Sequence, residues 1–488
     1  MTNFDFSQYF HIQPVSVQLV PDAEQPYGIP EGWIWVTLGS IGEYYNGRAF
    51  KQNEWTNVGR PIIRIQDLTG TNTNPNYYNG PVDQRHEVKA GDLLISWSAT
   101  LGAFIWNGPS AVLNQHIFKV KSSIDKMYHY YLVLHFINEL YQKTHGSGMV
   151  HITKGIFNAT PVPLPPLTEQ KKIVARIESL IGKIKLAKSH VEHIPSTITQ
   201  TINSLIHYAF SGKLTENFRS QYQNEIEPAE TLLERIRNKR NSKWEESIRS
   251  KGRSNKKNIC NQPEGIDTSN LPELPRGWCW VTLGELIEKI EAGKSPSAQG
   301  HPAASNEYGV LKVSAVSWGE FLPNENKALF PGYDVEGIPT VQEGDLLISR
   351  ANTVELVGAV VRVKESYPNL ILSDKTLRLV PILNDINIDY LLYALRTRYV
   401  RRLFEEATGT SDSMRNLSQD KILKAPIALA PLIEQNIIAE NIKNEERLLK
   451  ISANLSKDCL MNLEALVQQI LNKAFHGELG QTKVKTFT

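Results

Sequence analysis

The sequence is poor in cysteine and contains no long apolar run. Its three cysteines, Cys260, Cys279 and Cys459, lie far apart in 488 residues and form no paired spacing. This excludes a disulfide framework and a cysteine-rich zinc site, and it suits a reducing cytoplasm. No apolar stretch approaches the ~18–20 residues that a membrane-spanning helix needs. The first 27 residues lack the basic start and apolar core of a secretory signal, so we expect a cytoplasmic protein.

A strong excess of charge of either sign is also missing. The formal net charge is +2, with 41% hydrophobic and 21% charged residues, which is typical of a globular protein with well-formed cores. The length indicates about two to four domains. A nearly neutral chain can still bind DNA if its positive charge gathers on one face, so composition does not decide the partner.

Recognisable catalytic motifs are absent as well. Residues 74–77, Asn-Pro-Asn-Tyr, lack the second proline of the amino-methyltransferase motif and predict a turn. Residues 293–295, Gly-Lys-Ser, look like the end of a phosphate-binding loop, but Glu288 stands where its first glycine is required. The histidines show no metal-ligand spacing, and no Ser/His/Asp or Cys/His arrangement stands out. We therefore expect no enzymatic activity, bound metal or cofactor in this chain.

The main feature that is present is an internal duplication. Five short sequence motifs, called repeated words below, occur twice in the same order. They are Gly32–Gly39 and Gly277–Gly284, Ile63–Gln66 and Leu311–Ser314, Gly91–Ser96 and Gly344–Ser349, Pro166–Gln170 and Pro431–Gln435, and Ala209–Leu214 and Ala474–Leu479. The spacing between the two copies grows through the front part of each copy and then stays constant. Each copy thus has a front part of variable length and a back part of fixed length, which predicts a pseudo-symmetric molecule.

The front parts combine short β-rich runs with turn clusters, which predicts mixed α/β domains. The back parts predict long helices. Within 173–209, apolar residues recur in alternating steps of three and four, as in a coiled-coil seam. Pro195 should kink or split this helix. The corresponding seam within 438–474 is weaker because Glu445 and Ser452 interrupt it.

These patterns predict a mixed α/β protein with two pseudo-symmetric globular domains, separated by two long helices that form an antiparallel coiled coil. The expected segments are an N-terminal extension (1–28), a first globular domain (29–166), a first long helix (167–213), a polar and basic linker (214–270), a second globular domain (271–431), a second long helix (432–480) and a tail (481–488). Within the linker, residues 235–257 hold ten Lys or Arg against two Glu. A solvated helix with a flexible linker is the favoured interpretation, and a phosphate-contacting patch stays open.

The Pro-Leu-x-Glu-Gln start and the Ala-Phe-x-Gly-x-Leu end of each long helix, together with Gly-Asp-Leu-Leu-Ile-Ser in each front domain, resemble the specificity subunits of Type I restriction-modification enzymes. The resemblance extends from Ile29 to Leu479. It implies that each front domain is a target-recognition domain that reads one half of a bipartite site on double-stranded DNA. It also implies that the paired helices set the unread spacer between the halves.

The same resemblance implies the partners. Two modification (methyltransferase) subunits carrying S-adenosylmethionine would dock on the helices, and restriction subunits using ATP and Mg²⁺ would join them. This chain would itself bind no cofactor and catalyse no reaction. The sequence departs from the family pattern at Pro195 and in residues 1–28, to which the resemblance assigns no role.

Base reading requires hydrogen-bonding side chains held at a groove edge by a rigid scaffold. We expect such residues in three loops of each copy, at or just after the repeated words. The candidates in the first copy are Arg64, Gln66, Trp97, Ser98, Thr100, Ser147, His151 and Lys154. Those in the second copy are Lys312, Ser314, Arg350, Asn352, Thr353, Ser413, Arg415, Asn416 and Lys421. For each residue, an ordinary surface or intradomain role is the competing interpretation.

The tryptophans of the first repeated word, Trp33, Trp35, Trp278 and Trp280, are expected in the cores instead. Two other functions stay open for the whole chain. One is a coiled-coil assembly scaffold without DNA reading, against which the duplicated front domains argue. The other is an enzyme with an unrecognised site, against which the missing motifs argue.

Overall fold

The computed structural model describes residues 5–14, 16–142, 152–222, 224–251, 266–317, 320–382, 386–407 and 415–479. Contacts within the chain define two compact units. The first unit contains residues 1–193 and 455–488, and the second contains residues 194–454. Each unit therefore holds one front domain together with parts of the helices from both copies.

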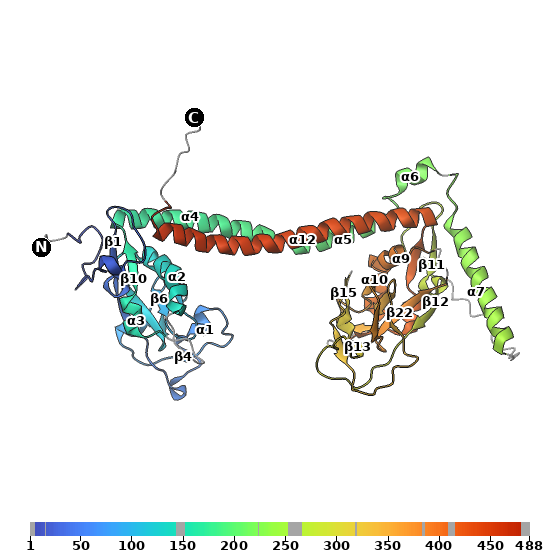
Figure 1. The fold of residues 1–488 in the computed structure, drawn as a ribbon. Helices are drawn as coiled ribbons and strands as arrows, with labels where there is room; N and C mark the ends of the chain where they lie inside the picture. The colour runs from blue at the N-terminus through green and yellow to red at the C-terminus, as the bar shows by residue number, and fades with distance from the viewer. Residues whose placement is uncertain are drawn as a thin grey trace. The chain divides into compact units, whose positions relative to one another are not determined.

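In the first unit, the front domain is built from short strands with α2 along one side (Figure 1). Its elements are η1 (Asp22–Glu24), β1 (Ile34–Thr37), η2 (Leu38–Ser40), β2 (Gly42–Asn46), η3 (Gln52–Glu54), β3 (Arg60–Ile63), α1 (Ile65–Leu68), β4 (Tyr77–Tyr78), η4 (Gln84–His86), β5 (Glu87–Val88), β6 (Leu93–Ser96), β7 (Gly102–Ile105), β8 (Ala111–Leu113), β9 (Ile117–Ser122), α2 (Lys126–Gln142), α3 (Lys154–Ala159), β10 (Pro161–Leu164), α4 (Leu167–Glu192) and the last part of α12 (Leu432–Phe475).

In the second unit, helices precede and follow the front domain. Its elements are α5 (Ile194–Phe210), α6 (Glu216–Gln221), α7 (Ala229–Lys251), β11 (Cys279–Thr282), α8 (Leu283–Leu286), β12 (Ile287–Glu291), β13 (Gly309–Leu311), η5 (Val313–Ala315), β14 (Val316–Ser317), β15 (Glu320–Phe321), β16 (Asn326–Ala328), β17 (Thr340–Val341), β18 (Leu346–Ser349), β19 (Ala351–Asn352), β20 (Val360–Arg362), β21 (Tyr367–Ile371), β22 (Thr376–Pro381), α9 (Ile388–Ala394), α10 (Arg398–Ala407), β23 (Arg415–Asn416), α11 (Gln419–Leu423), β24 (Pro426–Leu429) and the first part of α12.

The two front domains share one sheet topology. The four-stranded order β2-β9-β6-β7 of the first unit returns as β12-β22-β18-β20 in the second. The order β4-β3-β8-β5 returns as β16-β13-β21-β17, and the ribbon β1-β10 returns as β11-β24. Even the parallel pairing of β3 with β8 has its equivalent in β13 with β21. The mixed α/β fold and its duplication are therefore confirmed strand by strand.

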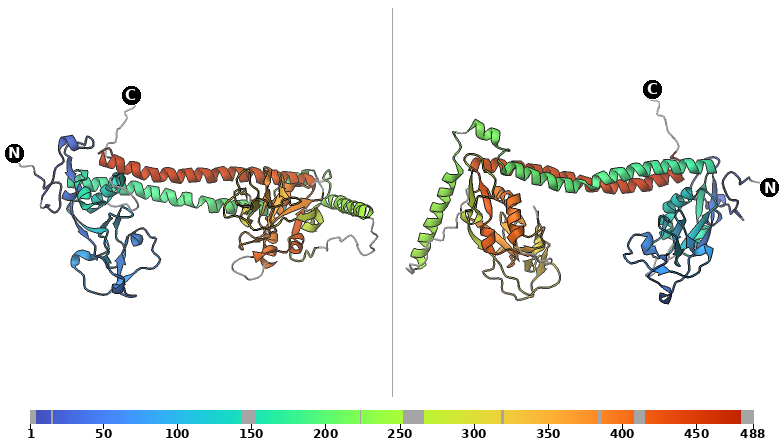
Figure 2. Two further views of the ribbon diagram at one scale, coloured as in Figure 1. Left: turned by 60° about the horizontal axis from the view of Figure 1, so that its bottom comes forward. Right: turned by 180° about the vertical axis from the view of Figure 1, so that it is seen from behind.

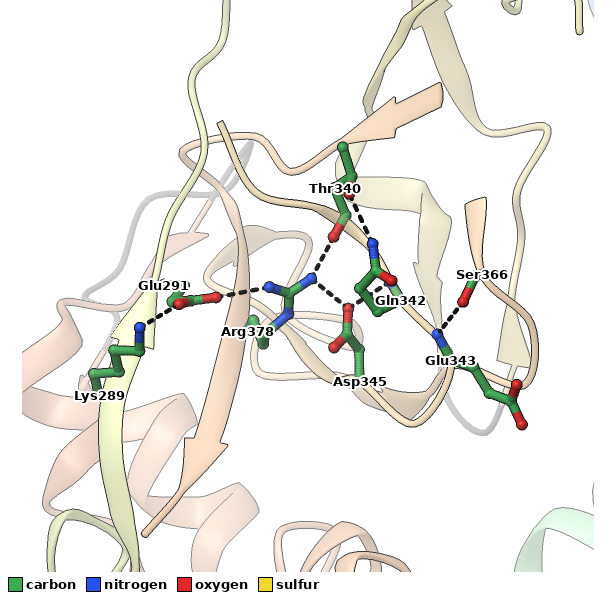
Figure 3. Close-up of polar contacts among 8 residues, drawn as sticks. All are labelled: Lys289, Glu291, Thr340, Gln342, Glu343, Asp345, Ser366 and Arg378. Carbon is green, nitrogen blue, oxygen red and sulfur yellow. Dashed lines mark hydrogen bonds and ion pairs between the residues drawn. The ribbon is translucent and has the colours of Figure 1, made fainter. Parts of the chain in front are cut away.

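The repeated word Gly-Asp-Leu-Leu-Ile-Ser forms the centre of each domain. All four residues of β6 and of β18 are buried. The aspartate of this repeated word forms an ion pair with a basic side chain of the neighbouring strand. Lys119 Nζ lies 3.5 Å from Asp92, and Arg378 Nη2 lies 2.6 Å from Asp345. Arg378 also pairs with Glu291 (Figure 3). The word thus supplies a core strand and its polar anchor.

The paired helices of the first unit run antiparallel. Ile177 of α4 is buried in one core with Leu471 and Phe475 of α12. Further along α4, Lys188 Nζ lies 2.8 Å from Glu464, which comes earlier in α12. The residue numbers therefore rise along one helix and fall along the other, and Figure 2 shows the two side by side.

In the second unit, α5 packs with the beginning of α12. Ile206 and Phe210 share a buried core with Ile438 and Ile442 and with the second front domain. The first copy's helical part therefore ends in the unit of the second front domain, and the second copy's helix ends in the unit of the first.

Both helical parts end at a glycine that a proline covers. Gly212 and Gly477 have φ values of +75°, which glycine adopts without strain. A Cβ at Gly212 would lie 2.1 Å from the Pro275 side chain, and one at Gly477 would lie 2.1 Å from Pro30. Since the two prolines occupy equivalent places in the two front domains, the helix-ending word is required for docking as well as for helix termination.

The first long helix is divided, as Pro195 predicts. It consists of α4 and α5, which meet at His193. Pro195 is the second residue of α5, where the missing backbone N–H is tolerated because the first turn of a helix leaves its N–H groups unbonded. The second copy forms one continuous helix of 44 residues, α12.

The N-terminal extension belongs to the first unit. Tyr9 and Phe10 are buried in its core, and Leu19 forms a β-bridge with Val36 of β1. The Gln170 side chain donates from Nε2 to the backbone oxygen of Tyr9 at 3.0 Å. The extension therefore covers the start of α4 and completes this core.

The beginning of α7, in the segment between the copies, docks on the second unit. Along α7, Ala229, Leu232, Leu233 and Ile236 are buried in the core of the second unit. Figure 1 shows α7 beside β11 and β12. These apolar residues, spaced by three and four, form a short docking face at the start of α7 that the sequence analysis did not predict. Further along, most described side chains of the basic run, residues 235–257, are exposed, as a solvated helix predicts.

The tryptophans of the first repeated word fill the cores, as expected. Trp33, Trp35 and Trp278 are buried. Trp280 is half-buried, with its ring centroid 5.0 Å from that of Tyr399. Among the described helices, none is long and apolar enough to cross a membrane.

Candidate nucleic-acid interface

Backbone hydrogen bonds join the predicted loops of the first unit along one edge. The N–H of Asn114 donates to Ile63 at 3.1 Å, next to Arg64. The N–H of Trp97 donates to His116, and the N–H of Ile152 donates to Trp97, both at 3.1 Å. We call this the first loop edge; it comprises residues 46–48, 64–66, 97–100, 114–116 and 152–154.

The second unit repeats this construction. The N–H of Arg350 donates to Lys375 at 2.9 Å, and the N–H of Leu417 donates to Arg350 at 2.7 Å. Strand β19 pairs with β23 and lies against η5. We call this the second loop edge; it comprises residues 293–295, 312–315, 350–353, 373–375 and 415–417. In both units, the structure brings together the three loops that the sequence singles out.

In the first loop edge, Trp97 is anchored and Lys154 extends from it. The Trp97 indole donates from Nε1 to Asn46 Oδ1 at 2.9 Å, and its ring centroid lies 4.9 Å from that of His116. Ser98 is buried, whereas Thr100 is exposed. Lys154 is exposed and donates to the Tyr44 carbonyl at 3.4 Å.

Arg64 and Gln66 follow β3 at the same edge. The Arg64 guanidinium lies over the Trp55 ring, 4.4 Å from its centroid, and its Nε is buried without a hydrogen-bond partner among the described residues. Gln66 is exposed. Both side chains are therefore available to a ligand at the edge.

Lys312 and Ser314 differ from their first-unit counterparts, Arg64 and Gln66, because both side chains bind a carboxylate of their own domain. Glu325 receives Lys312 Nζ at 3.3 Å and Ser314 Oγ at 2.6 Å. These contacts lower the pKa of Glu325, with the Ser314 hydrogen bond as the largest cause. The pair is less suited to contact an anion than Arg64 and Gln66.

Arg350 and Asn352 carry buried donors with no partner among the described residues, namely Arg350 Nε and Asn352 Nδ2. Thr353 and Asn416 are exposed beside them. Arg415 donates from Nη1 to the Glu405 carbonyl at 3.3 Å. An unsatisfied buried donor costs roughly 1–3 kcal/mol, so a ligand acceptor at this place would relieve a real penalty.

The candidate Lys421 does not join the second loop edge. Lys421 donates from Nζ to the Ala407 carbonyl at 2.6 Å, which ties α11 to α10. Ser147, His151 and Ser413 lie outside the described residues.

Sequence reasoning missed two basic residues of these edges, Arg48 and Lys294. Each follows a glycine that packs so closely against another backbone segment that no side chain would fit. A Cβ at Gly47 would lie 1.9 Å from the Asn114 carbonyl oxygen, and one at Gly293 would lie 1.7 Å from that of Leu372. Gly47-Arg48 and Gly293-Lys294 are thus a sixth repeated word, between the first two. Arg48 pairs with Glu54, and Lys294 is exposed.

The first loop edge also holds backbone strain. Within the described part of the chain, the non-glycine residues with positive φ are Ala99 (58°) and His116 (75°), and both belong to this edge. Such conformations persist where the surroundings enforce them and are common at binding sites. No group of three or more His, Cys, Asp or Glu in the described residues could hold a metal ion.

The comparisons with known proteins agree with this geometry. The family model described as the Type I restriction modification DNA specificity domain matches residues 30–195 and again 275–458. The EcoEI specificity subunit of Escherichia coli is 26% identical, covering 87% of this chain and 79% of its own length. The MjaVIII specificity subunit of Methanocaldococcus jannaschii is 22% identical, covering 92% and 94%.

A solved structure shows the same fold. The HsdS subunit of Thermoanaerobacter tengcongensis has a TM-score of 0.52 and 19% sequence identity, and the match covers 93% of this chain and all of that one. The two domain matches fall on the two units' front domains, which carry the two loop edges. The chain therefore belongs to the Type I restriction-modification DNA specificity family.

Proposed function

We propose that this chain is the DNA sequence-specificity subunit of a Type I restriction-modification complex and that each loop edge reads one half of a bipartite site. The observation that supports this most directly is the pair of equivalent edges. The same backbone hydrogen bonds fix Trp97 in one edge and Arg350 in the other. One scaffold thus presents different side chains, which is the requirement for reading two different half-sites.

The chain acts in this proposal without chemistry of its own. It carries no methyltransferase or nucleotide-binding motif, so S-adenosylmethionine, ATP and Mg²⁺ belong to the partner subunits. The alternative of an enzyme with an unrecognised site predicts methylation or ATP hydrolysis by the purified chain. We expect neither, in assays with radiolabelled S-adenosylmethionine and with ATP, each in the presence and absence of DNA.

The paired helices dock the modification subunits in this proposal. Large apolar side chains remain about half exposed on the helices of each unit, which suits a partner that covers them. They are Leu186, Leu455, Met461 and Leu466 in the first unit, and Tyr208, Ile433, Leu448 and Ile451 in the second. Because each unit carries its own set, two partner copies are proposed, one on each unit. A scaffold without DNA reading would use these surfaces but would not need the loop edges.

The deciding experiment exchanges one of the two front domains, each of which we propose to read one half-site. Residues 30–160 are replaced by the same region of a related specificity subunit, and the methylome of a host expressing the complex is sequenced. We expect one half of the methylated motif to change and the other to persist. A matched exchange of residues 272–430 should change the other half only. Motifs in which both halves change together, or neither does, would contradict two independent readers.

A further inference from the structure

The second loop edge presents side-chain donors from a fixed backbone. The backbone N–H and C=O of Arg350 are both bonded, to Lys375 and from Leu417. Asn352 lies in β19 and is paired with Arg415 of β23. The scaffold therefore holds the backbone from which these side chains extend.

The hydrogen-bonding capacity left on the Asn352 side chain is mainly that of a donor. Its Oδ1 accepts the N–H of Thr353 at 2.9 Å, while its Nδ2 is buried with no partner among the described residues. An asparagine that reads adenine needs both groups, because it accepts from N6 and donates to N7. The Oδ1 atom has one lone pair left and Nδ2 has no partner among the described residues, so Asn352 offers mainly donors.

Arg350 can only donate, since a guanidinium has no acceptor. Its Nε is buried and lacks a partner among the described residues. A guanidinium that only donates, with an amide donor two residues away, matches a base edge that presents acceptors side by side. Guanine is the base whose major-groove edge consists of two acceptors, O6 and N7, and arginine binds both at once.

The equivalent position of the first unit has different chemistry. Trp97 has the same backbone bonds as Arg350, but its indole N–H is engaged by Asn46 Oδ1 at 2.9 Å. This position therefore offers an apolar ring where the second unit offers donors. The two halves of the site should differ at the base pair that these positions face.

We propose that Arg350, supported by Asn352, reads a guanine through the major groove, so that the half-site of the second unit contains a G·C pair fixed by these two residues. This rests on the proposed function, because it assumes that the second loop edge contacts DNA. It adds the identity of one base, its groove and its position in one half of the site.

The test uses the full complex with its modification subunits. The methylome first gives the motif, and the exchange of residues 272–430 assigns one half to the second unit. That half must contain a G·C pair. Each guanine in it is then replaced by 7-deazaguanine, which lacks the N7 acceptor. We expect binding to the wild-type complex to weaken about 5- to 150-fold at one position. Inosine, which keeps O6 and N7, should bind like guanine there.

Substitutions identify the residue that contacts the guanine. Arg350→Ala should make that one base pair degenerate in the methylome and abolish the effect of 7-deazaguanine, while the other half-site stays unchanged. Arg350→Lys should restore binding only in part, because lysine lacks the planar fork. Lys364→Ala removes an exposed cation outside the edge and serves as the control, with no change of motif.

The outcomes separate this inference from the proposed function. A bipartite motif with a second-unit half that tolerates 7-deazaguanine everywhere would overturn the guanine contact and leave the two-reader model intact. A motif that is not bipartite would overturn the proposed function itself. Because the base analogues are tested on the wild-type complex, a misfolded Arg350→Ala variant would not prevent a decision.

Discussion

At the residue scale, Arg378 joins three elements of the second front domain. Its guanidinium lies 2.7 Å from Glu291 of β12 and 2.6 Å from Asp345, and it also donates to the Thr340 carbonyl of β17 (Figure 3). The side chains of Arg378 and Asp345 are only 14% and 11% exposed. A buried carboxylate that loses its cation is left without compensation.

We therefore expect Arg378→Met to lower the free energy of unfolding by about 3–5 kcal/mol. Denaturant titration of the full chain, followed by fluorescence, measures this loss. The matched control is Lys243→Met, since Lys243 and Glu288 form an ion pair in which each side chain is 38% exposed. That variant should lose less than about 1 kcal/mol. Equal losses would show that burial of the pair is not what matters.

His129 gives the first unit a dependence on pH. Its ring is fully buried between Tyr44 Oη at 2.9 Å and Ser122 Oγ at 3.0 Å, and burial lowers its pKa to about 3 from the usual 6.5. The equivalent residue of the second unit is Leu391, as the equivalent hydrogen bonds of Tyr128 and Tyr390 to β10 and β24 indicate.

Because the unfolded chain binds a proton at His129 at higher pH than the folded chain does, stability should fall as the pH drops from about 6.5 towards 3. Between about pH 6.5 and 5 the loss amounts to roughly 2 kcal/mol. Hydrogen exchange, corrected for intrinsic rates, should show α2 losing protection on acidification and α9 keeping it. His129→Gln should flatten the response of α2; an unchanged response would assign it to another group, such as His135, whose pKa burial lowers to about 4.

At the scale of elements, α7 is a brace on the second front domain. Arg240 donates from Nη2 to the carbonyls of Gly284, Glu285 and Ile287 at 2.7, 3.3 and 2.8 Å, which satisfies the end of α8. Arg237 pairs with Glu285 at 2.9 Å. Four of the ten cations of the basic run, Arg235, Arg237, Arg240 and Lys243, thus bind carboxylates or carbonyls of this chain.

Replacing Arg240 by Ala should cost about 1.5–3 kcal/mol, because charged hydrogen bonds to three backbone carbonyls are lost. It should also raise hydrogen exchange along α7. Lys239→Ala removes a neighbouring cation from an exposed position and should change neither quantity. If binding to non-specific DNA fell equally in both variants, the basic run would have to be reconsidered as a phosphate contact.

The elements that sequence alone predicts are those with local signals. The repeated words predict β6 and β18, and the three-and-four spacing with Pro195 predicts a divided first helix. The docking of α7 was not predicted, since Leu232 and Leu233 form only a short apolar face in a charged helix. The loop edges were found as separate loops, but their union depends on hydrogen bonds such as Ile152 to Trp97, which join distant segments.

At the scale of the whole molecule, the structure indicates where residues could be inserted to test whether the helices set the spacer. Ala209 and Phe210 are buried in the core of the second unit, so residues inserted there would disrupt docking. The chain passes between the units at His193 and again after Asn454. Insertions that lengthen the connection belong at these two points, and both must be made because the helices are paired.

Seven residues added after both His193 and Asn454 extend the helices by ~10.5 Å, which corresponds to at most about three base pairs. On the proposed function, we expect the methylome to show the same two half-sites with a longer unread spacer and reduced activity. The activity should fall because each added base pair also rotates the second half-site by roughly 35°. The same seven residues inserted after Glu225, between α6 and α7, should leave the spacer unchanged. An active double-insertion complex that kept the original spacer would show that the helices do not set it.

The ending of α12 in the first unit has a consequence for synthesis of the protein. Leu471, Ala474 and Phe475 complete the core around Tyr128 and Phe136, yet they are translated after the entire second front domain. At roughly 5–20 residues per second, the first domain waits on the order of 15–60 s for its last core residues. The second domain waits far less, because Phe210 precedes it. The first domain to leave the ribosome is therefore the last to close, and its open core is the surface that chaperones would have to shield.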